Sequence, residues 1–208
     1  LIGQLQWLIT LGRFDIQTSV MTMSSFRAQP RVGHIERVKR IYAYIHKFNN
    51  FKIRFRTEEP DLSHLDNSTQ QDWSQSVYGE HTEDVPDDMP VPLGKKVTLI
   101  HWFDANLMHD VLSGKAVTGC IHFANKTPMM WYSKKQSTTE TATYGAEFCA
   151  RTCIEQLVDL RNIFRYLGVP LHDISYVFGD NESMINSSKF PYARLHKRHN
   201  IIFYHITM

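Results

Sequence analysis

The sequence predicts an α/β fold, in which a mixed β-sheet with packed helices follows a small, mostly helical subdomain. Apolar residues recur at helical spacing through most of the first 48 residues. From Lys95 onward, short apolar runs separated by turn residues alternate with one long amphipathic stretch. Hydrophobic residues make up 42% of the chain, which is enough to form a core. We therefore expect a helical subdomain over residues 1–56 and an α/β domain over residues 95–208.

The N-terminal subdomain is expected to contain three helices and a final strand. Its apolar residues recur every three or four positions, and after residue 50 Phe and Ile alternate with Lys and Arg. In order, the expected elements are a helix beginning at Leu1, a helix that Asp15 caps and that stops before Pro30, a helix over 33–48, and a strand over 51–56. Trp7, like Trp102 and Trp131 further along the chain, is expected in the core.

The stretch over residues 57–94 differs from the regions on either side. It holds ten acidic residues and no Lys or Arg, together with four of the eight prolines. Such a composition without periodicity is typical of a linker. The rest of the chain contains 23 basic and 11 acidic residues, although the net charge of the whole chain is only +2. A positive surplus of this kind is typical of a protein that binds a phosphate backbone, and a merely solvated basic surface explains it equally well.

Strands and one long helix are expected after Lys95. The first strand is a continuous apolar run, and the next two follow the turn signals Ser113-Gly114 and Thr127-Pro128. A long amphipathic helix then ends at Gly168, with Pro170 just beyond it. The expected elements are strands over 97–103, 117–124 and 129–133, a helix over 143–167, a strand over 174–178, and a short helix over 182–188.

Three carboxylates are expected to meet at one edge of this sheet. Asp104 and Asp180 each follow an apolar strand, and Glu147 lies in the first turns of the long helix between them. Oxygen ligands of this kind bind Mg²⁺, and two such ions about 4 Å apart promote phosphodiester hydrolysis. Singly, each residue has an ordinary explanation as a turn residue or a solvated helix residue. Their order along the chain favours a metal site for two Mg²⁺ ions, or Mn²⁺ in their place.

Short motifs stand in a fixed order along the chain. In the C-terminal part they are Asp104-Ala105-Asn106, Gly114-Lys115-Ala116-Val117-Thr118-Gly119, Trp131-Tyr132-Ser133-Lys134-Lys135-Gln136, Tyr144-Gly145-Ala146-Glu147-Phe148, Gly179-Asp180-Asn181 and His196-Lys197-Arg198-His199-Asn200. Near the N-terminus they are Leu1-Ile2-Gly3-Gln4-Leu5 and Gly12-Arg13-Phe14-Asp15-Ile16. The first set resembles the ribonuclease H domain of copia-type retrotransposon polyproteins. The second resembles the thumb segment that follows the polymerase palm there, although Arg-Pro-Asp-Ile is the commoner form of its second motif.

The resemblance implies a ribonuclease H-like sheet and hydrolysis of the RNA strand of RNA–DNA hybrids within a reverse transcriptase. Asp104, Glu147 and Asp180 match the family's first three catalytic carboxylates, which bind the metal ions. Glu140 is a competing acid, but the Ala-Glu-aromatic context of Glu147 fits the motif better. The residues expected to contact the nucleic-acid backbone are Lys134, Lys135, Gln136, Lys197 and Arg198.

The chain departs from the family pattern in two ways. The family's fourth carboxylate belongs to an Ala-Asp motif that does not occur before Met208, and the polymerase aspartates are absent. We therefore expect a fragment of a longer polyprotein, whose remainder would be a partner. One alternative is an inactive remnant that only binds nucleic acid through its basic surfaces. Another is an enzyme of the same fold such as an integrase, which needs a different spacing of the acids.

The remaining composition suggests an intracellular protein, in a cytoplasmic particle or in the nucleus. The three cysteines do not have the spacing of a metal site and are expected to be small buried hydrophobic residues in a reducing compartment. No apolar run approaches the roughly 20 residues that a membrane span needs.

Overall fold

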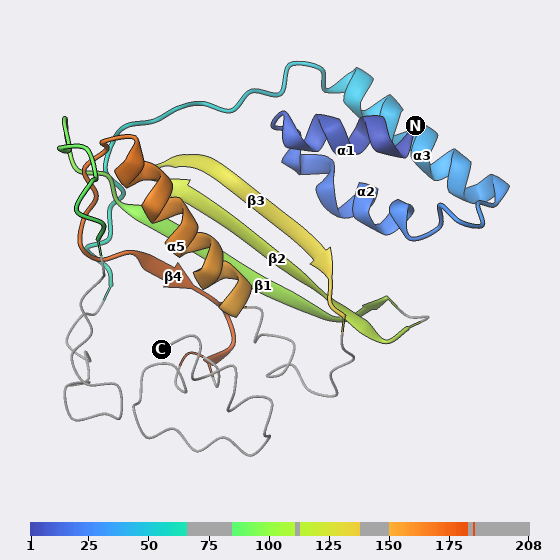
Figure 1. Cartoon of the computed structure of the whole chain (residues 1–208). Coiled ribbons are helices and arrows are strands. Elements are labelled where there is room, and N and C mark those ends of the chain that lie inside the picture. Colours follow the sequence, from blue (N-terminus) through green and yellow to red (C-terminus); the bar gives the residue numbers. More distant parts are fainter. Residues whose placement is uncertain (66–84, 111–112, 138–149, 183–184, 186–208) are drawn as a thin grey trace, which may run out of the picture. The chain divides into compact units, whose positions relative to one another are not determined.

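The computed structural model describes residues 1–65, 85–110, 113–137, 150–182 and 185. The chain divides into two compact units, Leu1–Phe55 and Arg56–Met208, and each is described by itself. The expected α/β organisation is confirmed. Helices form the first unit, and the second contains a mixed four-stranded sheet with a helix packed on it (Figure 1).

The first unit is built from short helices that bury one apolar face each. They are α1 (Ile2–Thr10), the 3-10 helix η1 (Phe14–Ile16), α2 (Gln17–Ser24) and α3 (Val32–Lys47). Short helices are marginal in water on their own, so packing of these faces against each other is what stabilises them. The shared core consists of Leu5, Ile16, Val20, Met23, Val38 and Ile41.

Three expectations for this unit are wrong. Asp15 does not cap α2: it lies within η1, where its carboxylate accepts hydrogen bonds from the guanidinium of Arg13. Residues 51–56 form no strand, since no strand among the described residues pairs with their backbone. Trp7 does not lie in the core, because 64% of its surface is exposed.

The second unit contains the sheet. Its strands are β1 (Leu99–Asp110), β2 (Lys115–Ala124), β3 (Thr127–Lys135) and β4 (Tyr176–Phe178). They lie in the order β3-β2-β1-β4, with antiparallel pairing among the first three strands and parallel pairing between β1 and β4. The predicted meander is therefore confirmed, as is a last strand after the long helix.

Helix α5 (Ala150–Tyr166) covers one face of this sheet (Figure 1). Two apolar clusters join the helix to the strands: one combines Leu99 with Leu157, Leu160 and Phe164, and the other combines Phe103, Ala105, Ala116 and Cys120 with Ala150 and Cys153. Because side chains alternate along a strand, the odd-numbered residues of β1 face α5 and the even-numbered ones face the other side. Cys120 and Cys153 are buried, as expected.

The ends of α5 and β1 differ in how well they match expectation. Gly168 follows α5 with a φ of 69° and donates to the carbonyl of Arg165, which confirms it as the predicted helix end. β1, however, does not stop at residue 103. Its pairing with β2 continues to Asp110 and Lys115 after an irregularity that begins at Asn106. Asp104 therefore lies within a strand and not just beyond one.

Other residues also differ from expectation. Trp102 is 51% exposed and not in the core, because it occupies an even-numbered position of β1. Ile163 and Leu167, two apolar residues of the expected helix over 143–167, are exposed. The expected helical residues 143–149, most of the short helix over 182–188, and residues 66–84 of the expected linker lie outside the described part of the chain.

None of the helices in the described ranges combines the length and the apolar character that a transmembrane segment requires.

Candidate functional site

Asp104 and Asp180 lie at the same end of two neighbouring strands. The parallel ladder between β1 and β4 ends with the pair Trp102 and Phe178. Asp104 and Asp180 each follow that last pair by two residues, and both are exposed. The topology therefore brings the two expected aspartates together at the end of the ladder, where β4 stops while β1 continues beside β2.

The residues next to Asp104 on the neighbouring strands have small side chains or none. The cross-strand partner of Asp104 is Gly119, and the partner of Gly119 on β3 is Ser133. A β carbon added to Gly119 would meet no side chain within 4 Å. The row across the strands therefore runs from a carboxylate, past a residue without a side chain, to a small hydroxyl. Among the described residues, such a row adds little side-chain volume above the sheet beside Asp104.

A row of large apolar residues borders the row that contains Asp104. In register across the four strands lie Phe178, Trp102, Ile121 and Trp131. The rings of Trp102 and Phe178 stack, with their centroids 4.5 Å apart and an angle of 22° between the ring planes. Because this stack stands on the face that α5 does not cover, Trp102 keeps half of its surface exposed.

The residues of β3 that are expected to contact nucleic acid lie on opposite faces of the sheet. Lys135 pairs with Val117, which in turn pairs with Asn106, so Lys135 lies on the face that carries Asp104. Lys134 pairs with Thr118, and it therefore lies on the face that carries α5. Gln136 already has structural contacts, since its side-chain amide donates to the Thr118 hydroxyl at 3.0 Å.

The other predicted site residues lie outside the described part of the chain. They are Glu147, with its competitor Glu140, and the basic pair Lys197 and Arg198. Within the residues that are described, no three His, Cys, Asp or Glu side chains are gathered as a possible metal site.

A buried polar cluster on the opposite face of the sheet was missed by the sequence analysis. His101 and His122 are cross-strand partners, and neither has exposed surface. Their Nδ1 atoms lie within hydrogen-bond distance of each other, and Nε2 of His122 lies 2.9 Å from Oε1 of Gln156 on α5. Strand alternation was the available signal, because both histidines occupy positions that face α5.

The partners of these rings determine their protonation. Because Oε1 of Gln156 is an acceptor, Nε2 of His122 carries the proton and its Nδ1 accepts one from Nδ1 of His101. Nε2 of His101 is then buried without a hydrogen bond from any described residue. Burial, with smaller effects from His122 and Arg161, lowers the pKa of His101 to about 3. Burial also lowers the pKa of His122, and the hydrogen bond to Gln156 partly opposes it.

In comparisons with protein-family models, with curated proteins and with solved structures, nothing matches this chain.

Proposed function

We propose that the second unit hydrolyses the RNA strand of RNA–DNA hybrids, with divalent metal ions, as part of a retrotransposon reverse transcriptase. The observation that carries the proposal is the position of Asp104 and Asp180, each two residues beyond the last pair of the β1–β4 ladder. The ordered motifs that resemble copia-type ribonuclease H domains supply the choice of substrate. The mixed sheet with α5 on one face is compatible with that type of domain.

The chemistry of the two side chains fits Mg²⁺ or Mn²⁺. Both cations prefer oxygen ligands, and Mg²⁺ usually takes only one or two carboxylates from the protein. Asp104 and Asp180 would hold the ions, and Glu147 would be the third ligand by the resemblance. Bound divalent ions supply Lewis acidity toward phosphate oxygens. Both aspartates are exposed at the surface of the second unit.

The surroundings of Asp104 fit a substrate with a regular backbone. Lys135 lies on the same face, where its positive charge would attract a phosphate. Gly119 opposite Asp104 adds no side chain that would keep a nucleic-acid strand away from the carboxylate. Contacts of this kind recognise the shape of the hybrid and its sugar hydroxyls rather than the base sequence.

Cleavage of a labelled RNA strand annealed to DNA tests the proposal. The intact chain should cut the RNA in Mg²⁺ or Mn²⁺ and not in EDTA. Asp104→Asn and Asp180→Asn should each lower the rate by more than about 100-fold, because loss of a group behind a metal ligand already costs about 10- to 100-fold. Asp159→Asn is the matched control, since Asp159 is an exposed aspartate of α5, and it should cut at the wild-type rate.

Two results would overturn the proposal. If Asp104→Asn cuts like the wild type, the carboxylates are not the site. If the wild type binds hybrid with strong salt dependence but never cuts it in either metal, the chain only binds nucleic acid, as the inactive alternative requires.

A further inference from the structure

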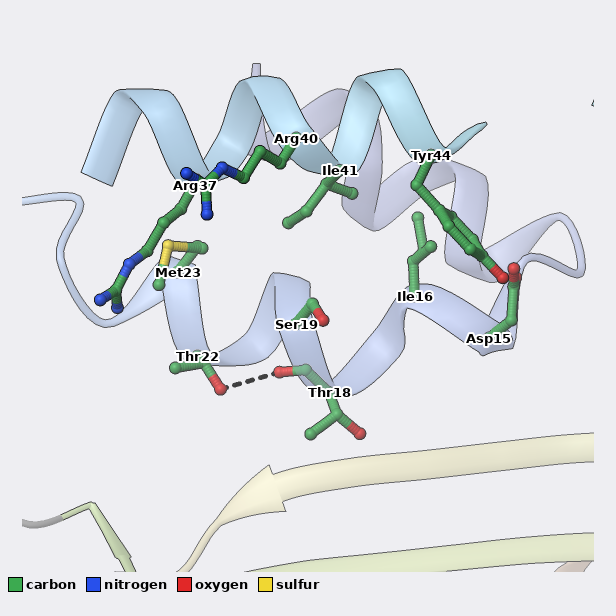
Figure 2. A pocket seen from close by; sticks show the side chains of 10 residues that line it. All are labelled: Asp15, Ile16, Thr18, Ser19, Thr22, Met23, Arg37, Arg40, Ile41 and Tyr44. Carbon is green, nitrogen blue, oxygen red and sulfur yellow. Dashed lines mark hydrogen bonds between the residues drawn. The ribbon is translucent and has the colours of Figure 1, made fainter. Parts of the chain in front are cut away.

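A groove runs between α2 and α3 in the first unit (Figure 2). Its volume is about 580 Å³, within the range of pockets that hold small ligands. The floor is formed by residues of the helical core, among them Ile16, Met23 and Ile41. This groove has no signal in the sequence, because its walls come from polar residues on two helices that the chain brings together only on folding.

One end of the groove is cationic. Arg37 and Arg40, one turn apart on α3, both extend toward the end at which Met23 lies (Figure 2). No described carboxylate lies within ion-pair distance of either guanidinium. Two neighbouring positive charges without an acidic partner favour an anion between them. A guanidinium also matches a phosphate in geometry, because it can donate two parallel hydrogen bonds.

The facing wall offers hydroxyl groups. Thr18, Ser19 and Thr22 line the groove from α2. The Thr22 hydroxyl donates to the carbonyl of Thr18 at 2.9 Å, whereas the Ser19 hydroxyl forms no hydrogen bond with another described residue. A phosphate bound by the arginines would thus find a further donor on the opposite wall.

The single carboxylate of the groove does not oppose an anion at the arginine end. Asp15 lies at the other end beside Tyr44 (Figure 2). It accepts two hydrogen bonds from Arg13, at 3.0 and 2.9 Å, which compensate its charge. Tyr44 presents a ring that is 41% exposed. The groove therefore combines a site for an anionic group with an apolar floor and an aromatic side chain.

We propose that this groove binds a nucleotide unit, with its phosphate between Arg37 and Arg40 and its base over the apolar floor toward Tyr44. The same chemistry occurs in a free mononucleotide and in one unit of a single strand. The proposal goes beyond the hydrolysis proposed above, since the groove lies in the other unit and needs neither metal ions nor cleavage.

Binding of AMP and of a fluorescein-labelled oligothymidylate to the intact chain, both in EDTA, tests the proposal. The double variant Arg37→Gln/Arg40→Gln should lose about 10-fold or more in affinity for AMP, since a hydrogen bond to a charged group contributes enough for that factor. Lys39→Gln/Lys47→Gln is the matched control. It removes the same charge from exposed positions of α3 that do not line the groove, and it should change AMP affinity by less than about 2-fold.

The two sources of the ligand give different results. If the groove serves a strand, the oligothymidylate binds more tightly than AMP and loses affinity selectively in the arginine variant. If the groove serves a free nucleotide, AMP displaces the labelled oligothymidylate, and the oligothymidylate binds no more tightly than AMP. Equal losses in both double variants, no AMP binding, or ribose 5-phosphate binding as tightly as AMP would each overturn the proposal. Unchanged circular dichroism of the variants ensures that a loss is not unfolding. Asp104→Asn, which tests hydrolysis, should leave AMP binding unaffected.

Discussion

Gly179 lies against the ring of Phe103, on the segment that joins β4 to Asp180. A β carbon at position 179 would come within 2.7 Å of Cε2 and 2.9 Å of Cε1 of that ring, and closer still to Cζ. Phe103 belongs to the cluster beneath α5 and is only 6% exposed, so its ring has little room to move. The core of the second unit and the placement of a proposed metal ligand therefore depend on the same close contact.

Gly179→Ala should destabilise the second unit by about 1 to 3 kcal/mol, the usual cost of adding a carbon to a packed core. Urea unfolding followed by tryptophan fluorescence measures it. Phe103→Leu removes the ring atoms that the new methyl group would meet. The double variant should therefore lose less unfolding free energy than the sum of the losses in the two single variants. Strictly additive losses would show that the two positions do not compete for space.

The elements with a regular apolar periodicity could be predicted from the sequence. The meander of β1 to β3 and the end of α5 at Gly168 came from apolar runs and turn residues. The extension of β1 to Asp110 could not be predicted, because polar residues interrupt the apolar run from residue 104 onward and backbone pairing with β2 holds them in the strand. A hydrogen-bond ladder of this kind has no signature in side-chain hydrophobicity.

For a related reason, only part of the candidate site could be predicted from the sequence. Asp104 and Asp180 could be placed together because each follows an apolar run, and the strands that contain these runs pair with each other. Trp102 was misjudged, since an aromatic residue in an apolar run is usually buried, and only the position of α5 decides which face is covered. Strand alternation could place His101 and His122 on the buried face, but their pairing with each other also requires the register between β1 and β2.

The buried histidine pair should make the second unit sensitive to acid. In the unfolded chain a histidine has a pKa near 6.5, whereas burial lowers the pKa of His101 to about 3 and also lowers that of His122. Below pH 6.5 the unfolded state therefore binds more protons than the folded state. The stability that comes from the lowered pKa of His101 is fully present above pH 6.5 and is lost as the pH falls toward 3, and the lowered pKa of His122 acts in the same direction.

Urea unfolding between pH 7.5 and pH 4 measures this slope. Replacing His101, His122 and Gln156 together by leucine removes the polar cluster without leaving one member unpaired, and it should flatten the pH dependence of the second unit. His46→Gln is the control, because His46 is an exposed histidine of the first unit. A triple variant with the wild-type slope would mean that other groups cause the acid sensitivity.

Arg13 should be the most sensitive charged position of the first unit. Its guanidinium binds both carboxylate oxygens of Asp15, donates to the carbonyl of Phe48 at 3.1 Å, and lies over the rings of Tyr44 and Phe51. Arg13→Gln should lower the unfolding free energy of this unit by about 1 to 2 kcal/mol, because several of these hydrogen bonds are lost together. Thermal unfolding followed by circular dichroism is the measurement.

Two further variants separate charge from geometry at this position. Arg13→Lys keeps the charge but cannot form the paired hydrogen bonds, so an intermediate loss is expected. Arg27→Gln removes an exposed charge of the same unit and should leave the stability unchanged. A loss in Arg13→Gln no larger than that in Arg27→Gln would contradict the structural role assigned to Arg13.

Asn125 in the turn between β2 and β3 should be hard to replace, because it has two separate roles. Its φ of 53° lies in the left-handed region, which asparagine tolerates better than most residues. Its Oδ1 accepts a hydrogen bond from the backbone of Thr98 at 2.9 Å, and its Nδ2 donates to the carbonyl of Thr57 at 3.0 Å. The side chain thus ties the turn both to the start of β1 and to the chain that enters the second unit.

Replacements at this position separate the two roles by their free energies of unfolding. Asn125→Gly keeps the backbone conformation but leaves the buried amide of Thr98 without its acceptor, which should cost about 1 to 3 kcal/mol. Asn125→Ala loses the same hydrogen bonds and adds about 1 kcal/mol of backbone strain. Lys126→Ala, next to it, removes only an exposed ion pair with Glu58 and should cost less than about 1 kcal/mol. Equal stability of the glycine and alanine variants would show that the left-handed conformation relaxes without cost, and that the hydrogen bonds alone account for the effect.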